Sequence, residues 1–297
     1  MVESVVRPSA VAAGVRLRRS LALEAGRRLL RSRSAVVGGA LLLGIGLAIL
    51  LAPVLSPYDP VKTNQRDPLE PPSAAHLMGT DRFGRDILSR VLWGGRASLS
   101  VGIVSVGIAA CSGVVLGLTA GYYGRRADAV IMRLTDLLLA FPGILLALAI
   151  IATLGASLPN LMIAVGISAI PDYIRITRGT VLGLMEQEYV LAARVVGCRD
   201  GVVIFKHIMP NVTAPLIVLA TLGTAGAIIT GSALSFLGLG IRPPVPEWGN
   251  MLADGREFLR YAWWVAFFPG LAIMLAVLAI NLLGDGLRDA LDPRIRL

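Results

Sequence analysis

Five long stretches that contain no Asp, Glu, Lys or Arg dominate this sequence of 297 residues. They cover residues 35–55, 97–123, 137–171, 212–241 and 261–284. Each stretch is long enough for a helix to cross the roughly 30 Å hydrocarbon core of a bilayer, because a helix rises about 1.5 Å per residue. The composition agrees, since 55% of the residues are hydrophobic and only 16% are charged. The sequence therefore predicts an all-α membrane protein.

The third uncharged stretch is too long for a single span. It has 35 residues, and the turn-forming sequence GASLPN lies in its middle, at residues 155–160. Dividing it there gives six transmembrane helices. The second of the two new helices must extend past Pro171, so it takes in Asp172, Arg175 and Arg178 near its end. We expect the long arginine side chains to reach the membrane interface from that position.

The basic residues predict the orientation of these helices. With both termini inside, the inner segments hold 19 Lys and Arg residues and the outer segments hold 9. Basic residues accumulate in cytoplasmic segments, so we expect both termini to be cytoplasmic. The net charge of +9 is then a signal of topology, and a nucleic-acid partner is not expected, because that would need a basic face on a soluble body.

The chain divides into five segments on this basis. Residues 1–34 are a basic cytoplasmic segment, 35–55 the first transmembrane helix, 56–96 an extracytoplasmic insert, 97–285 a five-helix transmembrane core and 286–297 a cytoplasmic tail. Residues 16–33 place leucines and arginines on different helix faces, which favours an interfacial helix on the inner leaflet. Alternatively, these arginines serve only to keep the N-terminus on the cytoplasmic side, as the positive-inside rule requires.

The longest inner loop, at about residues 180–211, is the most informative polar stretch. We expect a helix there from about Glu186 to Cys198, which Gly201 then ends. Ala193 and Gly197 lie four residues apart on one face of that helix. Small side chains at this spacing allow another protein surface to approach the backbone closely.

Two sets of residues inside the predicted spans have two readings each. Pro142 and Gly143 predict a kink, or more specifically the hinge of a gate. Thr230, Ser232 and Ser235 lie in a span rich in small residues. Close helix packing is the default explanation of this pattern, and a polar-lined transport path would also explain it.

The sequence predicts no catalytic, metal or cofactor site on this chain. His76, Asp81 and Asp86 of the outer insert form a weak metal hypothesis, and a loop packed over the outer mouth is the favoured reading. The sequence contains no GxxxxGK[ST] phosphate-binding loop, so it does not carry its own ATPase site. We therefore expect that energy for any transport comes from a partner.

The inner loop resembles the cytoplasmic coupling motif of ABC importer permeases. The sequence YVLAARVVGCRDGVVIFKHIMPN follows YIRITRG and places five residues on that pattern, namely Ala192, Ala193, Gly197, Ile208 and Pro210. It departs from the pattern at Leu191, where an acidic residue is usual, and Glu188 is the nearest carboxylate.

Further blocks of sequence make the resemblance more specific. They are LLAFP, HLMGTDRFGRDILSRVLWGGRASLSVG, SFLGLGIRPPVPEWGNML and NLLGDGLRDALDPRIRL. In this order they are similar to the second permease subunit of the dipeptide, oligopeptide and nickel importer family, over about residues 34–297. The resemblance implies a type I ABC importer permease fold, in the cytoplasmic membrane of a prokaryote.

The resemblance also implies partners. These are a related permease that forms a heterodimer with this chain, two cytoplasmic ATPase subunits that bind ATP and Mg, and an extracytoplasmic substrate-binding protein. The loop helix would then be a coupling helix, and the residues implied in ATPase coupling are Glu188, Tyr189, Ala192, Ala193, Arg194, Gly197, Ile208 and Pro210.

Within this resemblance the expected cargo is a di- or oligopeptide, and the fourth and fifth spans are the expected lining of the path. The alternatives are a nickel-chelate permease, a secondary transporter driven by an ion gradient, and a membrane anchor without a transport role.

Overall fold

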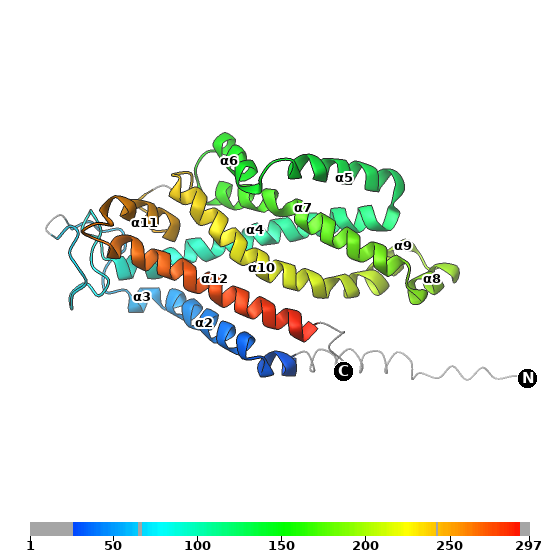
Figure 1. Cartoon of the computed structure of the whole chain (residues 1–297), viewed down its shortest axis with the longest axis horizontal. Helices are drawn as coiled ribbons and strands as arrows, with labels where there is room; N and C mark the ends of the chain where they lie inside the picture. The colour runs from blue at the N-terminus through cyan, green and yellow to red at the C-terminus, as the bar shows by residue number, and fades with distance from the viewer. Residues whose placement is uncertain (1–25, 65–66, 242, 292–297) are drawn as a thin grey trace, which may run out of the picture.

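The computed structural model describes residues 26–64, 67–241 and 243–291, and the elements it forms there are helices. They make an elongated bundle (Figure 1). Most of the expected interfacial helix at 16–33 lies outside the described residues, although residues 26–31 are helical. The helices of the bundle are α2 (Arg33–Leu50), α3 (Ala52–Leu55), α4 (Ile87–Tyr123), α5 (Arg125–Leu139), α6 (Gly143–Leu154), α7 (Leu158–Met185), α8 (Glu188–Val195), α9 (Asp200–Val202), α10 (Met209–Phe236), α11 (Trp248–Gly255) and α12 (Trp264–Leu291).

Among the described residues, four helices are long and apolar enough to cross a membrane. They are α2, α4, α12 and the continuous helix Asp200–Phe236, which joins α9 to α10 through the π-helical turn η1 (Val203–Ile208). The bent pair of α5 and α6 makes a fifth span if it counts as one. Helix α7 is also long, with 28 residues, but it carries three charged residues in its second half.

The predicted division of the third uncharged stretch is confirmed. Helix α6 ends before Gly155, whose φ of 86° suits glycine, and Ser157 caps α7 by accepting a hydrogen bond from the Asn160 amide. Pro171 lies inside α7, which continues to Met185 as expected.

The bend at Pro142 is sharper than the expected kink in a continuous helix. The helix is interrupted at residues 140–142, and α5 and α6 meet at 88°. Proline has no amide hydrogen to donate, and its ring disfavours helical geometry at Phe141, so the chain turns here instead of bending.

Helices α4 and α7 pack along their lengths with little space between their backbones. Gly117 and Gly121 of α4 lie against Thr177 and Val181 of α7, and Gly113 lies against Tyr173 one turn earlier. A Cβ atom on Gly117 would lie 2.6 Å from the Thr177 Cβ, and one on Gly121 would lie 2.7 Å from the Val181 Cβ. Glycine at each fourth residue therefore lets the two helices form one tight unit.

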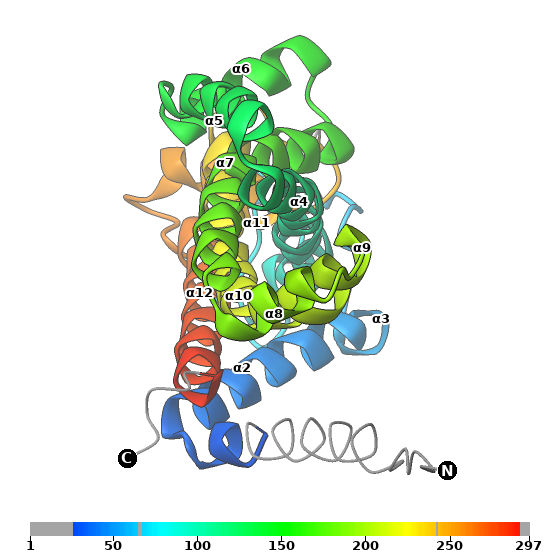
Figure 2. The ribbon, with the colours of Figure 1, turned by 90° about the vertical axis from the view of Figure 1, so that its right-hand side faces the viewer.

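The bundle has two distinct ends. Figure 1 shows α8 and α9 at one end and α11 at the other, with α4, α10 and α12 running between them. Helix α2 begins, and α12 ends, on the side of α8. Figure 2 shows α5 and α6 on one side of the bundle and α2 on the opposite side, with α4, α7 and α10 between them.

Candidate functional site

The loop that the sequence singled out forms a short helix at the α8 end of the bundle (Figure 1). Helix α8 starts at Glu188 and ends at Val195, where the chain turns through Gly197 with a φ of 81°. The Cys198 amide bonds the Ala193 carbonyl and the Gly197 amide bonds the Arg194 carbonyl, each at 3.0 Å. This is the Schellman arrangement, in which glycine takes a left-handed conformation that other residues adopt at a cost.

The expected end of this helix at Gly201 is therefore wrong, because Gly197 ends it four residues earlier. Gly201 instead lies inside α9, which continues as a helix into α10. Gly197 follows the helix instead of lying on its face, and a Cβ atom there would have no atom within 4 Å, so the space around it is open.

The inner side of the loop is a small apolar cluster. Val190 is the one buried residue of α8, and it packs with Tyr122 of α4, Val181 of α7, and Val203 and Ile208 of η1. Ile208 is fully buried, so it supports the loop from beneath. Pro210 is the second residue of α10, which directly follows the π-helical turn η1.

Three side-chain contacts fix the loop to neighbouring helices. The Tyr122 hydroxyl bonds the Asp200 carboxylate at 2.7 Å, and the Arg194 guanidinium lies 5.4 Å from the centre of the Tyr122 ring. The Asn211 amide donates to the Tyr189 hydroxyl at 3.1 Å, and burial raises the pKa of Tyr189. Tyr122 and Asp200 are 78 residues apart, so sequence reasoning missed this contact. The one signal in the sequence is that Tyr122 lies at the end of the uncharged stretch 97–123.

The outer side of the loop carries several exposed apolar side chains. Val195 is 87% exposed, Val196 83% and Phe205 73%. Leu191, at the position where the resemblance leads one to expect an acidic residue, is 46% exposed, and Glu188 and Ala192 are exposed on the same short helix. Ala193 is half-buried. Such a surface favours a protein partner, because soluble surfaces seldom leave large apolar side chains together.

The arginines in the second half of α7 pair with aspartates of α5. Arg175 pairs with Asp136 of α5 at 2.7 Å, and Arg178 makes a two-point contact with Asp128 of α5. Opposite charges on two adjacent helices form these pairs, so the second half of α7 is bound to α5.

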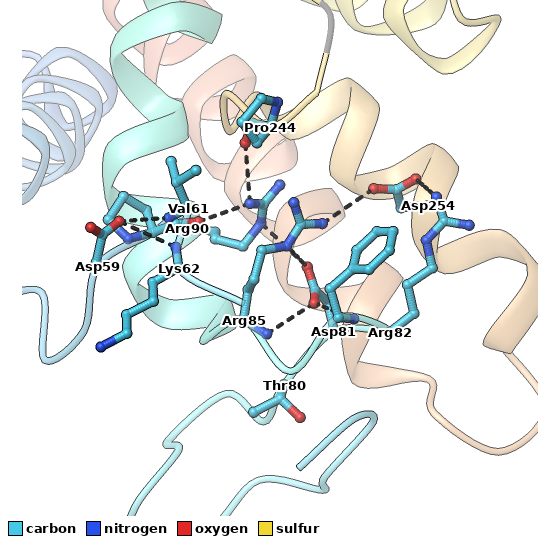
Figure 3. Close-up of polar contacts among 12 residues, drawn as sticks. Asp59, Val61, Lys62, Thr80, Asp81, Arg82, Arg85, Arg90, Pro244 and Asp254 are labelled. Carbon is cyan, nitrogen blue, oxygen red and sulfur yellow. Dashed lines mark hydrogen bonds and ion pairs between the residues drawn. The ribbon is translucent and has the colours of Figure 1, made fainter. Parts of the chain in front are cut away.

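A buried charge cluster holds the opposite end of the bundle together (Figure 3). The Asp81 carboxylate accepts hydrogen bonds from the side chain and the backbone amide of Arg85, and Arg90 lies 3.6 Å away. Arg90 donates to the carbonyl of Pro60 at 2.9 Å and lies near that of Pro244 at 3.4 Å. The cluster therefore ties the insert before α4 to the first turn of α4 and to the turn before α11.

The metal hypothesis finds no support at this end. Asp86 caps α4, and its carboxylate lies 2.9 Å from a ring nitrogen of His76 in a hydrogen bond. The Asp81 carboxylate instead forms ion pairs with Arg85 and Arg90. In the part of the chain that the structure describes, no group of three His, Cys, Asp or Glu residues is placed to hold a metal ion.

The remaining candidate residues lie apart from the loop. Pro142 and Gly143 are exposed at the turn between α5 and α6, and Thr230 is half-buried on α10. Ser232 and Ser235 are buried against α11, because a Cβ atom on Gly249 would lie 2.7 Å from the Ser232 Cα and 2.9 Å from the Ser235 Cβ. Within this chain, these two serines therefore serve the packing of α10 against α11.

Comparison with known protein families finds two matches. The family described as the binding-protein-dependent transport system inner membrane component matches residues 113–297, which include α8 and the glycine contacts between α4 and α7. The N-terminal transmembrane domain of oligopeptide transport permease C matches residues 20–72.

Individual relatives match nearly the whole chain. The dipeptide transport system permease protein DppC of Alkalihalophilus pseudofirmus is 48% identical over 92% of this chain and 90% of its own. The di/tripeptide transport system permease protein DppC of Pseudomonas aeruginosa is 48% identical over 89% of each chain. The glutathione transport system permease protein GsiD of Pectobacterium atrosepticum is 47% identical over 91% of this chain and 90% of its own.

Proposed function

Because the chain belongs to the family of binding-protein-dependent transport system inner membrane components, we propose that it is the permease subunit of an ABC importer that moves di- or oligopeptides into the cytoplasm. It is a transport permease and not an enzyme. The similar proteins named above transport dipeptides, di- and tripeptides, and glutathione, which are all peptides or peptide-like molecules. This favours a peptide over a nickel chelate as the cargo.

We propose that six segments cross the membrane: α2, α4, the α5–α6 pair, α7, α10 and α12. Helix α2 begins and α12 ends on the side of α8, as an even number of crossings requires (Figure 1). The excess of basic residues in the segments on this side supports a cytoplasmic α8 end and an extracytoplasmic α11 end. The five segments that the sequence suggests, from 1–34 to 286–297, fit this arrangement as a working division.

The exposed apolar tip of the α8–α9 loop carries the assignment of α8 as a coupling helix. Val195 and Val196, each more than four-fifths exposed, would insert into a groove of a cytoplasmic ATPase subunit. Glu188 and Arg194 would contact the rim of that groove, and Leu191 makes the contact more apolar than an acidic residue would. Ala192 and Ala193 leave room for the partner.

The complete transporter would contain this chain, a related permease, two ATPase subunits that bind ATP and Mg, and an extracytoplasmic substrate-binding protein. Closure of the ATPase pair on nucleotide would move α8 and the helices attached to it, so that access to the path alternates between the two sides. The path would lie between the two permeases. Thr230, Pro142 and Gly143 remain candidates for lining or gating it, because they are accessible from outside this chain.

A matched pair of substitutions tests the docking surface. Val195→Glu places a charge at the tip of α8, and Val54→Glu places the same charge at an 81% exposed valine of α3, near the α11 end. We expect Val195→Glu to abolish co-purification of the ATPase subunits and uptake of a labelled dipeptide. Val54→Glu should retain the ATPase subunits.

Full binding of the ATPase subunits by Val195→Glu would contradict the docking assignment. Uptake that continues without the ATPase subunits, driven by an ion gradient, would contradict the importer assignment altogether. Mass spectrometry of the ligand that co-purifies with the cognate binding protein identifies the cargo.

A further inference from the structure

Helix α4 reaches both ends of the bundle and has a polar anchor at each. Its 37 residues correspond to about 55 Å of helix. At the α11 end Asp86 caps it, and Arg90 joins the buried charge cluster (Figure 3). At the α8 end Tyr122 lies in its last turn. A helix that is held at both ends can transmit a displacement between them.

The packing of α4 against α7 makes this transmission rigid. The backbones approach closely at Gly113, Gly117 and Gly121, so the two helices pack as one unit. Helix α7 leads directly into α8 after two residues, Glu186 and Gln187. The loop is thus attached to the α4–α7 unit at its start by the chain itself.

The rest of the loop is attached to α4 through Tyr122. Its hydroxyl bonds Asp200 at the start of α9, and its ring lies under Arg194 in the last turn of α8. Among the described residues, these are the polar contacts between α4 and the segment 188–208. One side chain therefore contacts both helices that flank the turn at Gly197.

We propose that Tyr122 is a positioning residue for transport: it fixes the orientation of the α8–α9 loop relative to α4, so that loop movement displaces α4 and, through it, the α11 end. The inference rests on the proposed function, since it takes α8 to be the helix that docks with an ATPase subunit. Coupling of this kind acts in both directions. A binding protein that docks at the α11 end would therefore alter the ATPase rate through the same contact.

Removing one hydroxyl group separates this role from simple packing. Tyr122→Phe keeps the ring in the apolar cluster with Val181 and Val190 and leaves the ring face for Arg194, but it deletes the bond to Asp200. The adjacent Tyr123 is 56% exposed, so Tyr123→Phe is a control with the same chemical change. If Tyr122 served only for packing, Tyr122→Phe would have as little effect as Tyr123→Phe.

The experiment uses the full transporter reconstituted in lipid nanodiscs. The ATPase rate is measured with and without the binding protein loaded with a dipeptide, and the ratio of the two rates reports coupling. We expect Tyr122→Phe to lower this ratio about fivefold, which corresponds to about 1 kcal/mol, while Tyr123→Phe leaves it unchanged. The amount of ATPase subunit in each complex should stay the same.

Asp200→Ala removes the acceptor oxygens at an exposed position and provides a second variant. We expect this variant to lower the ratio as well. The double variant with Tyr122→Phe should have a ratio no lower than that of the more strongly affected single variant, because both substitutions delete the same hydrogen bond. An unchanged ratio in Tyr122→Phe, or losses that simply add in the double variant, would overturn the inference. A wild-type complex that holds no ATPase subunits would instead overturn the proposed function on which it rests.

Discussion

Replacing Gly117 by alanine tests the close contact between α4 and α7. A Cβ atom at this position would lie 2.6 Å from the Thr177 Cβ and 2.8 Å from the Ile174 carbonyl oxygen. The carbonyl belongs to the backbone of α7, so the helices themselves must separate to admit the methyl group. Gly107 lies ten residues earlier on α4, and a Cβ atom there would have no atom within 4 Å. It is therefore the matched control.

The two substitutions should change stability in opposite directions. Alanine favours a helix over glycine by about 1 kcal/mol, so Gly107→Ala should stabilise the protein by up to that amount. Gly117→Ala gains the same preference but overpacks a tight contact, which costs about 1–3 kcal/mol and toward the upper end where backbone must move. We therefore expect a net loss of about 1–2 kcal/mol for Gly117→Ala.

Thermal unfolding of the purified chain in detergent measures the difference. For a chain of this size, 1 kcal/mol shifts the midpoint by about 2 °C. The two variants should then differ by about 4–6 °C, with wild type between them, when the folded fraction is followed by size-exclusion chromatography after heating. If Gly117→Ala raised the midpoint as much as Gly107→Ala does, the glycine contact between α4 and α7 would be refuted.

Three further substitutions test the ends of helices. Asp86→Ala removes the cap of α4 and the partner of the Ser89 hydroxyl at 2.6 Å, and should cost about 2–3 kcal/mol in the same unfolding assay; a loss below about 0.5 kcal/mol would contradict the capping role. Glu247→Ala removes the buried cap of α11 and its bond to Ser98 at 3.0 Å, with a similar expected loss, and Glu247→Gln, which keeps an acceptor oxygen, should lose clearly less. Gly197→Ala forces alanine into a φ of 81° and should lower hydrogen-exchange protection of the last turn of α8 about fivefold; equal protection in this variant and wild type would show that the turn does not need glycine.

Much of the fold is readable from the sequence because transfer into a bilayer depends on local composition. Uncharged stretches of sufficient length predict apolar helices wherever they occur, and Gly155 and Ser157 mark a break between two of them through their own backbone and capping preferences. The short helix at Glu188–Val195 was likewise expected, within a few residues, from the spacing of small and apolar residues.

The details that were wrong or missed depend on neighbours in space. The C-terminal end of α8 is at Gly197 and not at Gly201, because hydrogen bonds and a left-handed φ decide between two glycines that look alike in sequence. The chain turns by 88° after α5, although a proline inside an apolar stretch is also compatible with a mild kink. Ser232 is buried against Gly249 of α11, a contact that forms only when α10 and α11 pack together.

The sequence by itself determined that this chain is a multi-helix membrane protein, and its motifs placed it in a permease family. Only the tertiary structure decided which residues link the two ends of the molecule. Tyr122 and Asp200 meet across 78 residues, and Arg175 and Asp136 across 39. Hydropathy acts on each segment separately, whereas hydrogen bonds and ion pairs act over about 3 Å, so such partners are defined only once the helices have packed.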